Sequence, residues 1–271
     1  MSAMEASNLT KSTLSRMFSE GKRFDSRGLL EHRDFEVSYN VSNKAEGSAR
    51  VKLGKTDVVV GVKLAVGEPY PDSKDKGNLT VSADLLPLAS PRFESGPPNF
   101  QAIELPRLVD RIIRHSGFID LKKLVIKEGE QVWTVMIDIY PINDDGNLID
   151  AASIGAYAAL RKTFIPELDE SGKIDYHKKP KTKLPIDEDI TPISFSFFKL
   201  GNSLIVDPTR EEEEVCETRI TFGISKVKKQ YLINSCQKFE QVPLTQEDIS
   251  NIMDIISKKY DEVNEKLKKL V

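Results

Sequence analysis

The most constraining feature of the sequence is a pair of strand-like runs in residues 47–66, "GSARVKLGKTDVVVGVKLAV". Both runs are rich in β-branched residues, which are typical of strands. They are separated at Gly54-Lys55-Thr56, a short glycine-containing break that is typical of a hairpin turn. The chain is therefore expected to contain antiparallel β-structure early in its sequence.

Helical and strand-like patterns alternate along the rest of the chain. A second hairpin is expected where "ISFSFFKLGNSLIVD" places a Gly-Asn turn between two apolar runs. The order strands, helix, strand, helix, strands, helix predicts an α+β fold in one domain covering residues 1–271. The predicted elements are helices at about 9–20, 101–116 (with Pro106 in or near the first turn), 151–161 and 245–271, and a buried strand at 132–139.

The last of these helices has the clearest pattern. Thr245 is its expected N-cap, and Asp248 falls in the first turn. Apolar side chains recur at helical spacing and predict one buried stripe, made of Ile249, Ile252, Ile256, Tyr260, Val263, Leu267 and Leu270.

Composition limits the classes of function. The chain has 271 residues, 39% of them hydrophobic and 30% charged, which is typical of a globular protein. No apolar run reaches the ~20 residues of a membrane helix, and "MSAMEASNLTKS" lacks the pattern of a signal peptide, so a cytoplasmic protein without a membrane partner is expected. With a net charge of −3, any contact with nucleic acid must be a local patch or belong to a larger assembly.

Metal and cofactor sites are not indicated. His32, His115 and His177 are scattered, without the spacing of metal ligands. Cys216 and Cys236 form no CxxC motif and are expected to be reduced thiols. No metal and no cofactor is therefore predicted.

Three arginines mark one side of the helix predicted at 101–116. Arg107, Arg111 and Arg114 are four and three residues apart, so they lie within roughly 60° of one another on a helix. A guanidinium group suits phosphate because it donates two parallel hydrogen bonds and stays charged. The pattern alone favours a solvated helix face with Asp110 and Glu104 as partners. Binding to a phosphate backbone is the alternative.

The segment "NDDGNLIDAAS", residues 143–153, has the outline of a phosphate-binding loop, with a glycine turn before a small-residue helix. However, Asp144, Asp145 and Asp150 surround the turn and would repel an anion, and no hydroxyl or cation occurs before Ser153. Leu148 and Ile149 offer only apolar bulk. The residues favour a capped helix start in a glycine turn.

Carboxylates are concentrated in "DPTREEEEVCETR". If a strand starts at Val215, Glu217 and Arg219 share one of its faces. Paired carboxylates can hold Mg²⁺ or act in acid–base catalysis. A run of four glutamates favours a solvated loop instead.

Several stretches together resemble the RNase PH family of phosphorolytic exoribonucleases, from about Arg23 to the C-terminal helix. "RFDSRGLLEHR" is similar to the family's Arg-x-Asp-x-Arg…Arg segment, and "EGSARVKLGKTDVVVGVK" to its first hairpin. "AIELPRLVDRIIR" resembles its arginine-bearing helix. "DDGNLIDAAS" stands where active members have Asp-Gly-Gly-(Thr/Ser)-Arg-Thr-Ala. The resemblance implies two βαβα-type halves related by a pseudo-two-fold axis.

The departures from this family pattern imply a loss of catalysis. Leu148 and Ile149 occupy the positions of the Thr or Ser and the Arg that bind the attacking phosphate. The family's two catalytic aspartates, six residues apart, match Glu211 and Glu217, whose side chains are each one methylene longer. The resemblance therefore implies an inactive phosphorolysis site, and the alternative is an exoribonuclease that is active in its own right.

An inactive member with "GNLTVSADLLPLA" and "FESGPPNFQAIEL" is most similar to the non-catalytic RNase PH-like subunit of the archaeal exosome. This resemblance implies a hetero-hexameric ring with a catalytic RNase PH-like sister subunit, an RNA-binding cap subunit, and single-stranded RNA as partners. It also implies that Arg107 and Arg111, and less directly Arg114, hold the RNA near the sister's active site. A third hypothesis is an assembly protein without RNA contact, which buried ion pairs along the arginine stripe would support.

Overall fold

The first of two large β-sheets is built around the hairpin expected in residues 47–66. In the computed structural model, which describes residues 7–170, 172–240 and 242–270, strands β2 and β3 pair antiparallel on either side of that turn. β3 also pairs antiparallel with β6, and β4 runs parallel to β6, giving the order β1-β2-β3-β6-β4 with β5 on the edge of β6. The strands are β1 (Phe35–Tyr39), β2 (Gly47–Leu53), β3 (Thr56–Gly67), β4 (Asn78–Ala83), β5 (Val125–Lys127) and β6 (Gln131–Asn143).

The second sheet is wholly antiparallel, with the order β10-β9-β11-β12. Its first hairpin turns at Gly201-Asn202, as predicted. The strands are β9 (Ile193–Leu200), β10 (Ser203–Val206), β11 (Thr218–Val227) and β12 (Gln230–Phe239). A small third sheet pairs β7 (Phe164–Ile165) with β8 (Thr182–Lys183) and carries a long surface lobe between them.

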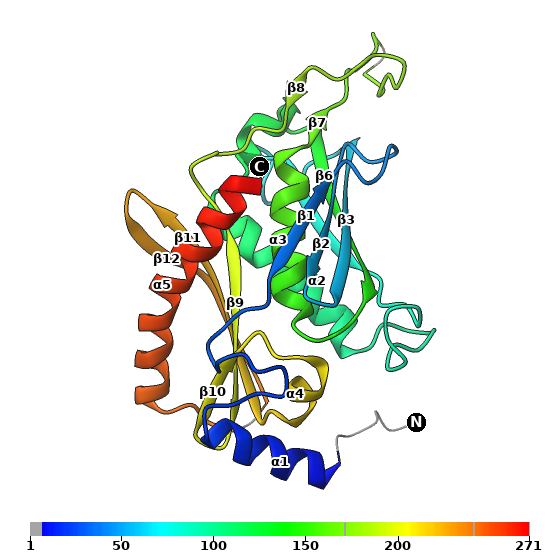
Figure 1. Cartoon of the computed structure of the whole chain (residues 1–271). Helices are drawn as coiled ribbons and strands as arrows, with labels where there is room; N and C mark the ends of the chain where they lie inside the picture. The colour runs from blue at the N-terminus through cyan, green and yellow to red at the C-terminus, as the bar shows by residue number, and fades with distance from the viewer. Residues whose placement is uncertain (1–6, 171, 241, 271) are drawn as a thin grey trace.

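Helix α3 lies between the two large sheets (Figure 1). It spans Leu148–Arg161 and contacts β2 and β3 on one side and β9 on the other. Most of its residues are buried, and its small side chains allow the sheets to approach closely, as the sequence predicts. A Cβ atom added at Gly155 would lie 2.7 Å from Cγ2 of Val60, so only glycine fits there.

The remaining helices are α1 (Asn8–Ser19), α2 (Phe100–Ser116), the 3₁₀ helix η1 (Leu121–Leu124), α4 (Arg210–Val215) and α5 (Gln246–Leu270). Of these, α2 lies beside α3 and contacts β4 of the first sheet and β11 and β12 of the second. None of the helices in the described part of the chain is both long and apolar enough to cross a membrane.

The C-terminal helix α5 agrees with its predicted pattern except at its end. The Thr245 hydroxyl accepts from the backbone N–H of Asp248 at 3.1 Å, and the Asp248 carboxylate accepts from the N–H of Thr245 at 2.8 Å. This is a capping box. Of the predicted stripe, Ile249 and Val263 are partly buried and Leu270 is exposed. The four buried residues are Ile252, Ile256, Tyr260 and Leu267.

The α+β fold predicted from the sequence is confirmed. Each half contains strands, a helix, further strands and a second helix, which is the repeated order implied by the family resemblance. The main hydrophobic core contains side chains from both halves, such as Val60 and Ile139 of the first and Phe195 and Ile256 of the second. This shared core supports the proposal that residues 1–271 fold as one domain.

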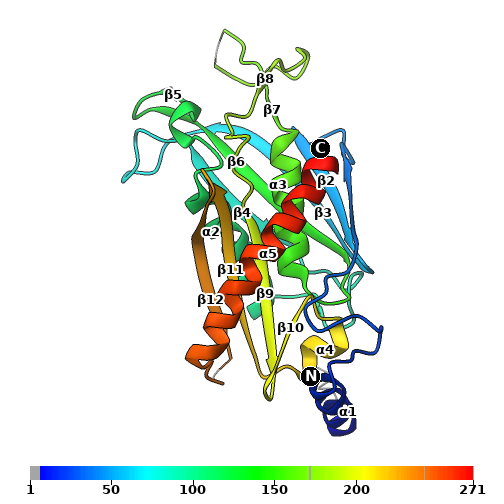
Figure 2. The same ribbon diagram turned by 60° about the vertical axis from the view of Figure 1, so that its left-hand side comes forward.

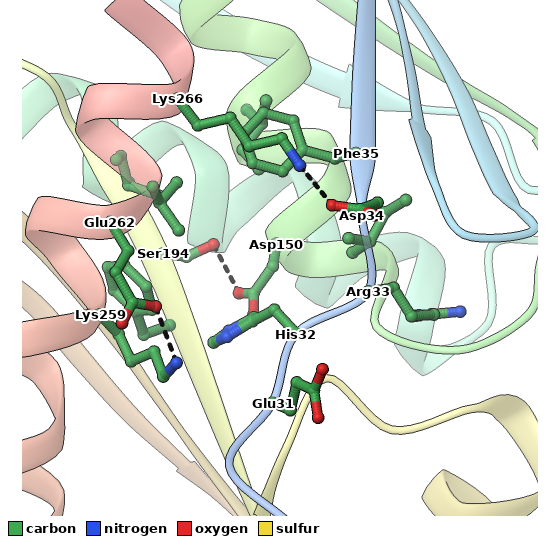
Figure 3. A pocket seen from close by; sticks show the side chains of 15 residues that line it. Glu31, His32, Arg33, Asp34, Phe35, Asp150, Ser194, Lys259, Glu262 and Lys266 are labelled. Atoms are coloured by element: carbon green, nitrogen blue, oxygen red, sulfur yellow. Dashed lines mark hydrogen bonds and ion pairs between the residues drawn. The ribbon is translucent and has the colours of Figure 1, made fainter. Parts of the chain in front are cut away.

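The buried carboxyl of Asp150 joins the two halves. It lies at the start of α3 and accepts hydrogen bonds from the Ser194 hydroxyl at 2.7 Å, and from the hydroxyl and backbone N–H of Ser196 at 3.0 and 3.1 Å. Figure 3 shows Asp150 and Ser194 pointing toward each other behind the segment that carries His32. Burial raises the pKa of Asp150 to about 6.

Replacing Asp150 with Asn should stabilise the protein relative to wild type at neutral pH but not in acid. The folded chain holds the Asp150 proton up to about pH 6, whereas the unfolded chain loses it near the ordinary value of 3.8. The wild type therefore loses stability between those two pH values, and the amide, which keeps partners among the serine hydroxyls, does not.

Urea unfolding at about pH 4 and about pH 7 should show a relative change of up to about 3 kcal/mol. Asp254→Asn, on the exposed side of α5, is the control and should show no such change. A difference between Asp150→Asn and wild type that stays the same at both pH values would contradict the assignment.

Candidate nucleic-acid interface

Helix α2 positions the three predicted arginines. The Asn99 side chain accepts from the backbone N–H of Ala102 at 2.9 Å and caps the start, and Gly117 ends the helix in the left-handed conformation with φ 75°. Pro106 is inside the helix, one turn further along than predicted. One face of the helix packs on the core and the other is open; the buried residues are Glu104, Leu105, Pro106, Leu108, Val109, Ile112, Ile113 and Ser116.

The three arginines differ in how free they are. Arg107 is exposed, and no hydrogen bond or ion pair joins it to the described residues. Arg111 is partly buried and donates from Nη1 to the amide oxygen of Gln237 in β12 at 2.8 Å. Arg114 donates to Asp110 at 2.6 and 2.9 Å and to the carbonyl of Leu79 at 2.8 Å.

Of the two intrahelical partners expected, Asp110 therefore pairs with Arg114. The hydrogen bond with Asp110 raises the pKa of Arg114 further. Glu104 turns inward instead and pairs with Arg219 of β11 at 2.5 Å. The stripe is thus not buried in salt bridges, and Arg107 keeps all five N–H donors available for another molecule.

Two large apolar side chains lie on the same open side of α2. Phe100 and Ile103 in its first turn are 55% and 51% exposed. The Phe100 ring stacks on Phe239 with ring centres 5.2 Å apart. Sequence reasoning missed both residues, although their signal was present: they precede Arg107 by seven and four residues, so helical spacing places them on its side. Basic and exposed apolar side chains thus share one surface.

The carboxylates of the loop before α3 are occupied by protein cations. Asp144 pairs with Arg92 at 2.7 Å. Arg33 donates from Nη1 to the Asp145 carboxylate at 3.4 Å and to its carbonyl at 2.9 Å. Asp150 points inward, toward Ser194. The prediction that Asp144, Asp145 and Asp150 together repel an anion at this turn is therefore wrong, because they do not all face one site.

The prediction of a capped start for α3 is wrong, because no side chain caps this helix. Asn147 is the N-cap, but it has the left-handed conformation with φ 56°, and its side chain makes no capping hydrogen bond. The side-chain amide instead donates to Asp207 at 2.9 Å. The backbone N–H of Asn147 donates to the carboxylate of Glu213 at 3.0 Å. A protein carboxylate therefore already binds an N–H group at this helix start.

The glutamate run forms helix α4, not the predicted solvated loop. A capping box joins Thr209 and Glu212 at its start. The Glu212 carboxylate is buried and accepts from Nε of Arg23 at 2.9 Å. This pairing between residues 189 positions apart has no local sequence signal.

The helical turn changes which acids face the loop before α3. Glu211 is exposed, and Glu217 accepts from Gly201 N–H and pairs with Lys11 of α1, both at 3.1 Å. The residues beside Leu148 and Ile149 are Glu213 and Arg219, which are also six positions apart. The resemblance matched the family aspartates to Glu211 and Glu217, but each residue that faces Leu148 and Ile149 lies two positions further along the chain. Burial raises the pKa of the Glu213 carboxyl.

The charges of the cleft beside Leu148 and Ile149 are paired internally. It encloses about 30 Å³ and adjoins a wider hollow of about 320 Å³ that shares Arg92, Glu213 and Arg219 with it. Its cations, Arg92 and Arg219, pair with Asp144 and Glu104. In the described ranges, no group of three or more His, Cys, Asp or Glu side chains is placed to hold a metal ion. The cleft therefore presents paired ions and apolar bulk, without a free cation for an anionic ligand.

Comparison with known proteins gives a consistent result. Models of the two domains of the 3′ exoribonuclease family match residues 31–166 and 191–256. The chain is 41% identical, over all of its length and 99% of the relative, to "Exosome complex component Rrp42" of Thermococcus kodakarensis. It is 50% identical to the Archaeoglobus fulgidus protein of that name, over 76% of this chain and 77% of the relative.

A solved structure agrees with these relatives. A chain of the "archaeoglobus fulgidus exosome with RNA bound to the active site" superposes with a TM-score of 0.86 at 42% identity, covering 96% of this chain and 98% of that one. The agreement extends over both sheets and the helices between them. The chain belongs to the RNase PH family of 3′ exoribonucleases.

Proposed function

We propose that this protein is a non-catalytic subunit of an exosome, a ring of RNase PH-like subunits that degrades RNA from the 3′ end by phosphorolysis. The names of its relatives and the RNA-bound structure support its place in such a complex. We infer the loss of catalysis from one contact: the Glu213 carboxylate accepts a hydrogen bond from the N–H of Asn147, next to Leu148 and Ile149.

Phosphorolysis requires a bound phosphate as the nucleophile. A phosphate needs hydrogen-bond donors or cations aimed at its oxygens. Here one backbone donor is taken by Glu213, the neighbouring side chains are apolar, and Arg92 and Arg219 are neutralised. A second anion would also be repelled by Glu213 when that group is ionised.

The proposed role of the subunit is to hold RNA for a catalytic sister subunit. Arg107 is free and Arg111 uses one of its donors, so both can form paired hydrogen bonds with a phosphodiester. Arg114 is held by Asp110 and contributes less. The freedom of Arg107 favours this role over that of an assembly protein without RNA contact.

The exposed apolar residues near the arginines favour a neighbouring subunit on the same side. Phe100 and Ile103 are both more than half exposed, and such side chains mark contact surfaces when they gather. We assign this surface to the sister subunit in a hetero-hexameric ring, so that RNA held by Arg107 reaches the sister's active site. An RNA-binding cap subunit and a cytoplasmic location belong to the same proposal.

The first test is the phosphate-dependent degradation of single-stranded RNA by this chain alone, by the sister alone and by the mixture. The mixture should release nucleoside diphosphates faster than the sister alone, and this chain alone should release none. Release by this chain alone would support the alternative, an active phosphorolytic exoribonuclease. A mixture no faster than the sister would contradict the holding role.

Replacing Arg107 and Arg111 with Ala should weaken RNA binding by the mixed ring by roughly tenfold or more at low salt, because two phosphate contacts are lost. The binding curve should also depend less steeply on salt. The control is Lys228→Ala with Lys229→Ala, exposed residues in the β11–β12 turn that should leave binding unchanged. RNA affinity equal to wild type in the arginine variant would contradict the proposed contact.

Replacing Glu213 with Gln should leave the activity of the mixed ring within about twofold of wild type, because its carboxylate binds the Asn147 N–H and no reacting group. The amide oxygen of Gln can still accept that hydrogen bond. Assembly measured by size-exclusion chromatography serves as the control for folding. A large loss of phosphorolysis in a fully assembled ring would show that Glu213 acts in catalysis.

A further inference from the structure

The lobe between β7 and β8 ends in a lysine-rich stretch, "YHKKPKTK", residues 176–183, which we name the lysine strip. It contains four lysines and no carboxylate. All eight residues are exposed. The lobe projects from the end of the molecule opposite α1 (Figures 1 and 2), so the strip is remote from the cleft beside α3.

Three lysines of the strip follow one another at every second residue. Strand β8 contains Thr182 and Lys183, and residues 179–181 before it are not helical, in keeping with the preference that Pro180 imposes on Lys179. Lys179, Lys181 and Lys183 therefore lie within five residues of one exposed, non-helical segment.

These three lysines are also unpaired within the described chain. Lys178 pairs with Asp175 at 3.4 Å, but no ion pair or side-chain hydrogen bond joins the ammonium group of Lys179, Lys181 or Lys183 to a described residue. Tyr176 at the start of the strip is 70% exposed, and the ammonium group of Lys63 lies 5.7 Å from the centre of its ring. A large aromatic ring left in solvent beside unpaired cations offers a stacking surface as well as charge.

We propose that the lysine strip is a second contact for single-stranded RNA, separate from the arginines of α2, and this inference rests on the proposed function. Unpaired lysines on an exposed segment without carboxylates suit a strand that carries one phosphate per nucleotide. An exposed aromatic ring adds base stacking without sequence preference. The ring favours RNA over an acidic protein surface, because an acidic protein surface would use only the charges.

The strip would act on parts of the RNA that are distant from the 3′ end. It lies at the far end of the molecule from the loop and cleft at the start of α3. Its last residues approach the C-terminal end of α2, where the N–H of Asp120 donates to the carbonyl of Pro185 at 2.9 Å, whereas Arg107 lies in the first half of that helix. The contact would raise the affinity of the ring for long substrates by holding them at two places. Short oligonucleotides would bind through the arginines alone.

The test compares binding of a fluorescein-labelled oligoadenylate of about 30 nucleotides with one of about six, a length that spans one contact only. The protein is the chain assembled with its sister subunit, in phosphate-free buffer so that the RNA stays intact. The variant is Lys179→Glu with Lys181→Glu and Lys183→Glu. The matched control makes the same charge change at exposed sites elsewhere, Lys228→Glu with Lys229→Glu and Lys258→Glu.

The strip variant should bind the long RNA at least about tenfold more weakly at low salt than the control does, with the slope of log affinity against log salt reduced by about 2. Its affinity for the short RNA should match that of the control. Equal affinities of variant and control for the long RNA would overturn the inference. If Arg107→Ala with Arg111→Ala still weakens binding in that case, the proposed function stands without it.

A third outcome would also overturn the inference. If the strip variant binds RNA like the control but loses assembly with another protein subunit, the strip is a protein contact. If neither the lysine nor the arginine variant affects RNA affinity, the proposed function fails together with the inference.

Discussion

The carboxylate of Asp207 joins segments on which the rest of the candidate site depends. It accepts from Arg33 at 2.7 and 2.9 Å, from Arg27 at 3.1 Å and from the side-chain amide of Asn147 at 2.9 Å. Burial would raise its pKa, but the hydrogen bonds with Arg33 lower the pKa of Asp207 to about 2. A buried ion held by this many donors is tolerated, whereas loss of one partner leaves an uncompensated charge. One side chain thus links the segment before β1, the loop before α3 and the end of β10.

This network explains how the loop keeps its shape without a phosphate. Thr56 donates its hydroxyl to the carbonyl of Gly146 at 2.7 Å, and the Arg33 side chain donates to the same carbonyl at 3.2 Å. At Gly146 an added Cβ would lie 2.6 Å from the carbonyl oxygen of Pro208, so the glycine is required by close packing. Protein groups therefore supply the contacts that order the turn before Leu148 and Ile149.

Sequence patterns were sufficient where the determining contacts are local. The hairpin turn at Gly54, the capping box of Thr245 and the stripe of α5 all depend on residues within one or two turns of one another. The helix α4 was missed although Thr209-x-x-Glu212 has the pattern of a capping box, whereas the burial of Glu212 against Arg23, 189 positions away, has no local signal. The family resemblance matched its acids to Glu211 and Glu217, whereas the structure places Glu213 and Arg219 beside Leu148 and Ile149.

The pairing of charges also bears on the proposal that an acidic chain contacts RNA. Several arginines that the sequence offers as cations, including Arg23, Arg33, Arg92 and Arg219, are neutralised by buried or partly buried carboxylates. The net charge of −3 therefore says little about the surface that meets RNA. What matters is the small set of cations left unpaired, and Arg107 on α2 belongs to that set. Isolated contacts of this kind bind weakly, so a ring that repeats them around a pore gains affinity that one subunit lacks.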